Sequence, residues 1–299
     1  MEGTEVLDES IQTKVPEISK TNEKAKKELK IFDYTISRIF AYFVVYSIGG
    51  FIIETVFGML TKGVIESRKS MLYGPFCCIY GLGAICLICI PRKLKRNNWY
   101  LFFSGIFIGS VVEYIVSWLG EYIFHVKWWD YSYIPFNING RICLLFSVFW
   151  GILTVFLNRL VNPTVDKWLD KVKENKVWHK ILIAIVIFMA IDEALTCFAL
   201  KMFLTRVIYN NKLDVKGVDT YYEEYLDLYQ NHQGVKKFID VAFSDKKMIM
   251  TFPNIKLTSK DDDIILVSDV LKDITPYYLR IFNPQEKLKL DLDLNLRKN

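Results

Sequence analysis

Five long apolar runs dominate this sequence, and each is about as long as a membrane-spanning helix of roughly 20 residues. They cover Arg38–Leu60, Leu72–Ile90, Trp99–Phe124, Ile142–Val161 and Ile181–Leu204. A soluble core could bury one such run but not five. The sequence therefore predicts an all-α membrane protein, a polytopic helical bundle of about five transmembrane helices, whose first partner is the lipid bilayer.

Composition and polarity divide the chain into three parts. Hydrophobic residues make up 52% of the 299 residues, and the mean hydropathy is +0.20, both high for a soluble protein. Residues 1–35 lack the apolar region of a secretory signal and are expected to form a polar, mobile extension. Residues 36–205 form the predicted transmembrane domain. Residues 206–299 are predicted to be a small extramembrane C-terminal region, with strand-like pieces at Met248–Phe252 and Ile264–Val267.

The basic residues lie beside the apolar runs, which indicates topology rather than nucleic-acid binding. No nucleic-acid motif accompanies the net charge of +5. The N-terminal extension and the second and fourth connections hold sixteen Lys and Arg, against five in the other two connections. The positive-inside rule then places the N-terminus in the cytoplasm of a multi-pass protein of the cell membrane.

Several strings resemble a known bacterial family. They are MLYGPFCCIYGLGA at residues 71–84, EYIVSWLGEYIF at 113–124, FHVKWWDYS at 124–132 and FNINGRICLLFSVFWG at 136–151. They are similar to the ABC-transporter type IV permease family of CmpB-like integral membrane proteins, over roughly Ile36 to Leu204. The resemblance implies a permease that moves a small solute with the help of a separate ATPase.

The chain itself lacks the G-x-x-x-x-G-K-[ST] motif of such an ATPase. The segment Thr164–Trp178 has apolar residues at near-helical spacing with lysines between them, which predicts an amphipathic helix on the inner surface. This helix is the candidate contact for an ATPase subunit.

The connection between the third and fourth runs, His125–Gly140, is unusually polar and aromatic. Trp128 and Trp129 are typical of the aromatic belt at the membrane surface. Other polar residues crowd beside them: Asp130, Asn137, Asn139 and Arg141. Together with Pro135 and Gly140, these suit a folded turn over the helix ends. Two interpretations stay open: a belt anchor alone, or a structured outer lid that contacts substrate or a partner.

Arg141 and Glu121 lie at similar depth on the fourth and third runs, by the rise of 1.5 Å per residue. An ion pair between them would keep Arg141 from facing lipid alone. The alternative is that Arg141 extends to the lipid headgroups.

Acidic residues inside the apolar runs are costly and are therefore candidates for function. Glu54, Glu113 and Asp192, followed by Glu193, come from three different runs. Their depths fall in one band, roughly 17–24 Å from the inner edge. Together they predict a substrate or ion path, with a proton relay or a cation-coupled site. The alternative is a set of hydrogen bonds between helices.

The second run carries residues that break helices. Tyr73, Gly74 and Pro75 open it, and Gly81 and Gly83 follow. This pattern indicates a broken or re-entrant helix, whose irregular backbone must be shielded from lipid. We therefore include Tyr73 among the candidates for lining a solute path.

Two short motifs are assigned to packing. Gly105 and Gly109 form a G-x-x-x-G that would let the third helix approach a neighbour closely. Cys86 and Cys89 have C-x-x-C spacing, but apolar residues lie between them and the nearest His is distant. We predict apolar filling there, and neither a metal site nor a cofactor.

Three classes of function remain. The first is a permease subunit of a small-solute transporter, energised by a separate ATPase or by protons or cations. The alternative is a membrane-embedded enzyme or envelope-maintenance factor that acts on lipid, with Glu113 or Asp192 as acid–base group and Arg141 on a headgroup phosphate. The third is a sensor or assembly partner. Without a nucleophile–base pair or H-E-x-x-H, we identify no catalytic residue, so enzyme activity stays uncertain. A homo-oligomer is left open.

Overall fold

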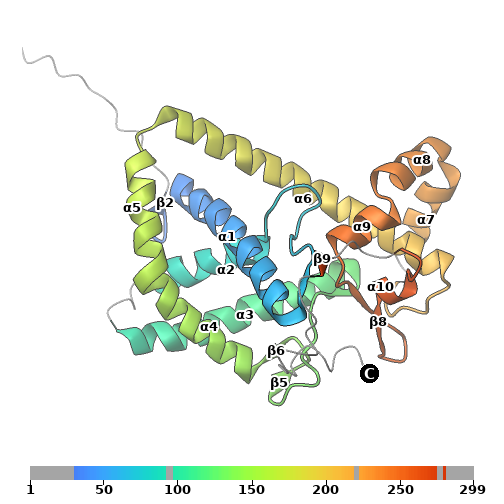
Figure 1. The fold of residues 1–299 in the computed structure, drawn as a ribbon, viewed down its shortest axis with the longest axis horizontal. Helices are drawn as coiled ribbons and strands as arrows, with labels where there is room; N and C mark the ends of the chain where they lie inside the picture. Colours follow the sequence, from blue (N-terminus) through green and yellow to red (C-terminus); the bar gives the residue numbers. More distant parts are fainter. Residues whose placement is uncertain (1–29, 92–96, 219–221, 275–278, 281–299) are drawn as a thin grey trace, which may run out of the picture.

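The structure, a computed structural model, describes residues 30–91, 97–218, 222–274 and 279–280. Four helices in this part are long and apolar enough to cross a membrane. They are α1 (Ile36–Lys62), α3 (Asn98–Phe124), α4 (Leu144–Phe156) continued by α5 (Asn162–Val172), and α6 (Lys176–Asn210) (Figure 1). The predicted class, an all-α membrane protein, is confirmed. Residues 1–29 of the predicted extension lie outside the described residues.

The second apolar run, Leu72–Ile90, does not form one continuous helix, and this corrects the prediction. Helix α2 spans Cys78–Cys89, which is 12 residues. At 1.5 Å per residue that is about 18 Å, too short for a hydrocarbon core of about 30 Å. Residues 66–77, ahead of it, are not helical. Gly74 and Pro75 lie in this stretch, where the sequence pattern indicated a break.

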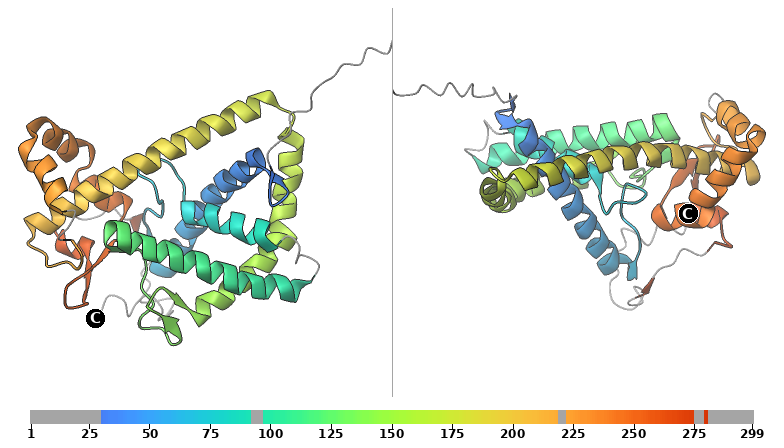
Figure 2. Two further views of the ribbon diagram at one scale, coloured as in Figure 1. Left: turned by 180° about the vertical axis from the view of Figure 1, so that it is seen from behind. Right: turned by 90° about the horizontal axis from the view of Figure 1, so that it is seen from above.

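Helix α2 begins beside the middle of α1 and runs back toward the start of α1. A Cβ atom on Gly50 would lie 2.3 Å from Cβ of Tyr80, and one on Gly81 would lie 2.7 Å from the carbonyl oxygen of Phe43. Glycine at these two positions is what allows the helices to touch. Residues 66–77 and α2 together therefore return the chain from the end of α1 to its beginning. Seen from above, α1 is inclined steeply to α6 (Figure 2).

Helices α3 and α4 form a close antiparallel pair. A Cβ on Gly105 would lie 2.3 Å from Oγ1 of Thr154, and one on Gly109 would lie 2.6 Å from Cβ of Trp150. The close approach predicted from the G-x-x-x-G spacing is therefore present. The chain passes five times between two ends of the bundle, four times as a long helix and once as residues 66–89. We call the end with residues 125–143 the lid end, and the end with Arg38 and α5 the basal end.

The segment Thr164–Trp178 is not a separate surface helix, which corrects a second prediction. A π-helical turn, Leu157–Val161, joins α4 to α5, so that α5 continues α4. Asn175 then starts α6, because its side-chain oxygen accepts the N–H groups of Val177 (2.8 Å) and Trp178 (3.3 Å). The amphipathic pattern thus spans two helices and the turn between them.

The region after α6 packs at the lid end (Figure 1). It contains α7 (Tyr222–Asn231), α8 (Gln233–Ala242), α9 (Asp245–Thr251), β7 (Lys256–Thr258), β8 (Ile264–Leu266) and α10 (Val267–Val270). The strand predicted at Met248–Phe252 is helix α9, whereas the strand predicted at Ile264–Val267 is present as β8. A core that includes Phe203, Phe243 and Leu257 joins this region to α6.

Two short antiparallel pairings join the C-terminal region to the bundle, and a third lies within the connection after α3. Strand β7 pairs with β4 (Val126–Lys127), which directly follows α3, and β3 (Val64–Ile65) pairs with β9 (Leu279–Arg280). Within the connection after α3, β5 (Asn137–Ile138) pairs with β6 (Ile142–Cys143). The C-terminal region is thus attached to the chain just after α1 and just after α3. A further pair, β1 (Lys30–Ile31) with β2 (Tyr34–Thr35), precedes α1.

Candidate functional site

Asp192, in the middle of α6, holds the non-helical stretch in place. Its Oδ2 accepts the N–H of Gly74 at 2.7 Å, and both carboxylate oxygens lie 3.2 Å from the N of Tyr73. One helical turn further on, Thr196 Oγ1 accepts the N–H of Leu72 at 2.9 Å. Asp192 and Thr196 are 2% and 1% exposed. Because lipid offers no partner to a backbone N–H, these two side chains allow non-helical backbone to lie among the helices.

The N-terminus of α2 is also satisfied by neighbouring polar groups. Ser70 Oγ accepts the N–H of Cys78 at 2.9 Å, and Cys77 donates its N–H to the carbonyl oxygen of Ser47 at 2.9 Å. Helix α2 therefore starts inside the protein, with its first N–H groups directed at the chain that precedes it.

Tyr73 lies in the non-helical stretch of residues 66–77, which we call the break. It links the break to the C-terminal region. Lys247 of α9 donates to the Tyr73 hydroxyl at 3.1 Å, and its Nζ lies 4.5 Å from the centre of the Tyr73 ring. On the other side, Lys69 donates to the carbonyl oxygen of Leu72 at 3.1 Å. Tyr73 itself is 49% exposed. The structure thus places this candidate at the surface of the break, under a lysine from α9.

The other acids of the predicted band have separate partners. Tyr80 of α2 donates to Glu54 of α1 at 2.5 Å. Glu193 is exposed, and its Oε1 lies 4.0 Å from Sγ of Cys197 one turn further along α6. Although adjacent in sequence, Asp192 and Glu193 therefore differ in surroundings, because one is buried against the break and the other lies on the surface.

Glu113 lies at the centre of the α3–α4 pair, beneath the lid end. Tyr131 donates to its Oε1 at 2.9 Å, and the indole N–H of Trp150 donates to its Oε2 at 3.0 Å. Glu113 is 5% exposed. The ring of Tyr131 stacks on Phe146 of α4, with centroids 4.7 Å apart. A residue of the connection after α3 thus reaches back into the bundle and contacts a buried acid.

A small cavity lies beside Glu113. It is lined by Ile79, Gly83, Leu87, Gly109, Val112, Glu113 and Trp150, from α2, α3 and α4, and its volume is about 10 Å³. A cavity of that size holds about one water molecule. A Cβ on Gly83 would meet no atom within 4 Å, so this face of α2 has free space. The cavity is therefore a narrow space between the short helix and an ionisable side chain.

The connection after α3 is folded back over the helix ends, and we call residues 125–143 the lid. Trp129 donates its indole N–H to the carbonyl oxygen of Arg141 at 2.9 Å. Asn137 donates to the carbonyl oxygen of Ile134 at 2.8 Å and accepts the N–H of Gly140 at 3.0 Å. Gly140 has φ +66, which favours glycine.

The remaining lid candidates have local contacts as well. Asp130 accepts a hydrogen bond from the Ser132 hydroxyl at 2.6 Å. A Cβ on Gly120 would lie 2.4 Å from Nε1 of Trp128, so the Trp128 ring packs directly on the last turns of α3. Asn139 donates to the Tyr114 hydroxyl at 3.0 Å. The structure therefore places every predicted lid residue in contact with the lid itself or with α3.

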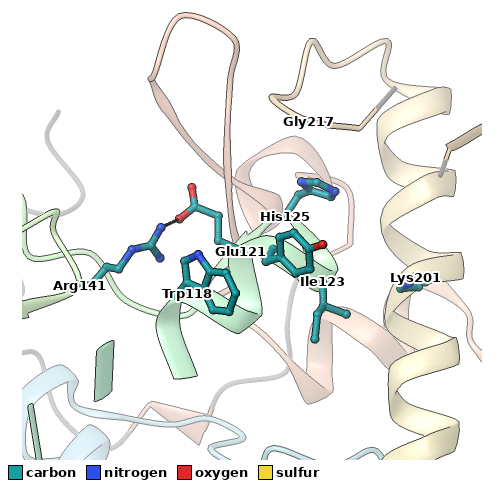
Figure 3. A pocket seen from close by; sticks show the side chains of 8 residues that line it. Trp118, Glu121, Ile123, His125, Arg141, Lys201 and Gly217 are labelled. Carbon is teal, nitrogen blue, oxygen red and sulfur yellow. Dashed lines mark ion pairs between the residues drawn. The ribbon is translucent and has the colours of Figure 1, made fainter. Parts of the chain in front are cut away.

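Arg141 and Glu121 lie side by side at the lid end (Figure 3). Nη2 of Arg141 is 2.6 Å from Oε2 of Glu121, with side chains 16% and 28% exposed. Nη1 donates to Ser117 at 3.3 Å, and the guanidinium carbon lies 5.7 Å from the centre of the Tyr114 ring. The Arg141 side chain is thus directed along α3.

The carboxyl groups that share a depth do not share a site. Glu113 bonds to the lid and α4, Asp192 bonds to the break, and Glu54 bonds to α2. No group of three or more His, Cys, Asp or Glu among the described residues could hold a metal ion. Equal depth was a poor guide to proximity because α1 is steeply inclined and α2 lies between α1 and α3.

Sequence reasoning missed a polar cluster at the basal end. Arg38 donates to Asp166 and to Asp170, each at 2.7 Å, and Tyr42 donates a short hydrogen bond to Asp166. Asn162 donates to the other oxygen of Asp166 at 2.9 Å. This cluster joins the start of α1 to α5. The available signal was the spacing of Asp166 and Asp170, four residues apart on a predicted helix, opposite an Arg at the edge of an apolar run.

Comparison with protein families shows which family the chain belongs to. The family described as "Putative ABC-transporter type IV" (ABC_trans_CmpB) matches residues 41–197. The chain belongs to this family. The match in this CmpB family runs from α1 to α6 and includes the break, Glu113, the lid and Asp192. Searches of curated proteins and of solved structures gave no match.

Proposed function

We propose that the protein is the permease subunit of a small-solute transporter in the bacterial cell membrane, as its CmpB family description suggests. The discontinuous second pass carries this proposal. Transporters typically bind solutes or ions near the middle of the membrane, where a span is split and a short helix begins inside the protein. Residues 66–77 and α2 have this arrangement, supported by Asp192 and Thr196 of α6.

The proposed path runs past Glu113, between α2, α3 and α4. The cavity beside Glu113 supplies its narrowest part, and Gly83 faces that space. Tyr131 covers Glu113 from the lid end. In this proposal the structure represents a state closed at the lid end, and opening requires Tyr131 to leave Glu113.

The orientation follows from charge. The N-terminal extension and the second and fourth connections hold sixteen Lys and Arg, against five in the first and third connections, which supports a cytoplasmic N-terminus. The C-terminal region is also rich in lysine, but long segments cross a membrane largely regardless of their charge. The lid and the C-terminal region then face outward, and α5 with the turn at residues 173–175 faces the cytoplasm. That turn exposes Lys173, Glu174 and Asn175, and it is the contact we propose for a separate ATPase subunit.

The ATPase contact is tested with a photo-cross-linking amino acid in place of Glu174, in membranes of the source organism. We expect an adduct that also incorporates a photoreactive ATP analogue. The same amino acid in place of Lys237, an exposed lysine of α8 at the other end, is the matched control. An ATP-labelled adduct from position 237 and none from position 174 would contradict the proposed orientation and contact.

Proton coupling is the alternative energy source, and Glu113→Gln tests it. Glutamine can still accept the Trp150 N–H while its own amide donates to Tyr131, but it cannot carry a proton in exchange. In proteoliposomes containing a pH-sensitive dye, the unaltered protein should admit protons under an imposed potential, and Glu113→Gln should abolish the flux. Equal flux in Glu113→Gln and in the exposed control Glu223→Gln would eliminate Glu113 as a relay.

A further inference from the structure

A row of polar side chains runs along α4 and α5, from the middle of the bundle to its basal end. It recurs every four residues and consists of Thr154, Asn158, Asn162, Asp166 and Asp170. The first three are buried, and exposure rises to 57% at the Asp170 side chain. From Thr154 to Asp166 this polar row covers about 18 Å of helix. That is more than half of a hydrocarbon core of about 30 Å.

The π-helical turn between α4 and α5 keeps the polar row on the inner side of these two helices, which form one rod (Figure 1). In a regular α-helix, a row of every fourth residue rotates by roughly 40° per step. Here Asn162 donates its N–H to the carbonyl oxygen of Leu157, five residues back, so the helix is wider at this turn. The wider turn counters the rotation, and Asn158 and Asn162 are both buried. Such turns occur frequently at functional sites.

The inner end of the polar row reaches the wall of the cavity beside Glu113. Trp150 donates to Glu113 through its indole, and its carbonyl oxygen accepts the Thr154 hydroxyl at 2.7 Å. Asn158 donates to the carbonyl oxygens of Thr154 and of Leu87, each at 2.9 Å. Leu87 of α2 lines the cavity. Asn158 is therefore in direct contact with a residue of the cavity wall.

The other end of the polar row lies at a pocket of the basal end. Asn162 accepts the Tyr46 hydroxyl at 2.9 Å and donates to Asp166 at 2.9 Å. Asp166 lines, together with Arg38 and Asp170, a pocket of about 610 Å³ that we call the basal pocket. Side-chain hydrogen bonds thus connect Asn162 to this pocket.

Asn158 carries an acceptor that these contacts leave unused. Its Oδ1 is buried and has no hydrogen-bond partner among the residues that the structure describes. The side chain stands between the two connected parts of the row, one ending at Thr154 and the other at Asn162. A buried acceptor without a hydrogen bond lowers stability, and a buried water molecule is the usual partner of such a group.

We propose that Asn158 binds a water molecule that completes a route for water from the basal pocket to Glu113. Along this route, a hydronium ion from the basal side gives its proton to the Glu113 carboxylate and leaves as water. Because Tyr131 covers Glu113 from the lid end, the exchange occurs with the basal side alone while the lid is closed. The water site stands on the contacts of Asn158, whereas proton delivery rests on the proposed function.

Hydroxyl-radical labelling by brief X-ray irradiation in heavy-oxygen water tests the site, because the radicals form from water and label side chains next to it. In the full chain purified in detergent, Leu87 should gain heavy oxygen although it is 1% exposed. Ile88, its neighbour in α2 at 0% exposed, should gain none.

Three variants locate the water. Asn158→Leu fills a similar volume without an acceptor, and should reduce the labelling of Leu87 to the level of Ile88. Asn158→Ser keeps a hydroxyl and leaves room for water, so it should keep the labelling. Thr205→Val is the matched control: it removes a buried hydroxyl at the lid end that also has no partner among the described residues. It should leave Leu87 labelled as before.

Three results would overturn the proposal. The first is an unaltered protein in which Leu87 is as unlabelled as Ile88, which decides the matter even if a variant fails to fold. The second is undiminished labelling of Leu87 in Asn158→Leu, since water would then enter from elsewhere. The third is an equal loss in Asn158→Ser or Thr205→Val, which would indicate repacking.

The labelling needs no transport, so it separates this proposal from the permease proposal. Labelled Leu87 without proton flux in the proteoliposome assay would contradict proton coupling and leave the water site standing. Proton flux with unlabelled Leu87 would contradict the water route and leave the proposed function standing.

Discussion

The carboxylate of Asp192 lies 2.7 Å from the backbone nitrogen of Gly74, across 118 residues of sequence. This contact joins the last long helix to the one pass, among the described passes, that is partly non-helical. It explains how a chain with Gly74 and Pro75 in an apolar run still crosses the bundle. The backbone N–H groups of Tyr73 and Gly74, which are not in a helix, donate to Asp192 of α6 instead. Through this contact, α6 stabilises the non-helical part of the second pass.

Removal of the Asp192 carboxylate should destabilise the protein strongly. Asp192→Ala leaves the N–H groups of Tyr73 and Gly74 buried without this acceptor, at a cost of about 3 kcal/mol or more. Asp192→Asn keeps one oxygen and should cost less. Thermal unfolding in detergent measures both, and Glu193→Ala, on the exposed neighbour, is the control. Equal unfolding temperatures for Asp192→Ala and Glu193→Ala would show that the break does not depend on this contact.

The Glu121–Arg141 pair should be energetically coupled. Because both side chains are mostly buried, Glu121→Gln or Arg141→Gln alone leaves a charge without its partner. We expect a coupling of about 1 kcal/mol in a double-mutant cycle of unfolding free energies. Purely additive effects would mean that Arg141 is stabilised by the headgroups and by Ser117 instead.

The lid and the start of α3 should face opposite sides of the membrane. Single cysteines at Ser132 and Asn97, in a background without native cysteines, report this directly. An impermeant thiol reagent on intact cells should label position 132 and leave position 97 unlabelled until the cells are opened. The reverse pattern would invert the orientation.

His125 should make stability depend on pH in the mildly acidic range. Its pKa in the folded protein is below 6.5, mainly through burial, so the unfolded chain takes up a proton first as the pH falls. Stability is therefore complete above about pH 6.5 and falls as the pH decreases toward the folded pKa. Asn tolerates the left-handed φ of +54 at this position, so His125→Asn should flatten this part of the curve. Identical unfolding curves of the two proteins between about pH 5.5 and 7.5 (roughly one unit either side of the ordinary histidine pKa) would contradict the assignment.

Much of the fold could be predicted from the sequence because hydrophobic length is a direct signal. The four long helices follow from apolar runs, and the close α3–α4 contact follows from Gly105 and Gly109. The interruption near Gly74 and Pro75 was also visible. Its extent was not, since it depends on acceptors from α6, 118 residues away. Likewise, an amphipathic pattern at Thr164–Trp178 does not reveal that Asn175 starts a new helix.

The site was harder to predict. Position along an apolar run indicates how deep a residue lies in the membrane, but not which neighbouring helix its side chain points toward. Glu54, Glu113 and Asp192 share a depth, yet they bond to different parts of the chain: α2, the lid with α4, and residues 73–74. The partner of Glu113 was missed for the same reason: Tyr131 belongs to the WWDYS string, but nothing local shows that its side chain turns down into the bundle. The depth argument did place Glu121 near Arg141, since a short connection makes α3 and α4 neighbours.

The most direct test of the proposed path is the access of water to position 83. Gly83→Cys, in a background without native cysteines, places a thiol in the free space beside Glu113. Ile88→Cys, on the same helix but 0% exposed in the core against α1, is the control. If the protein is a permease with this path, a small impermeant thiol reagent should label position 83 from both sides of the membrane and position 88 from neither. A thiol at position 83 that stays unlabelled from both sides would contradict the account.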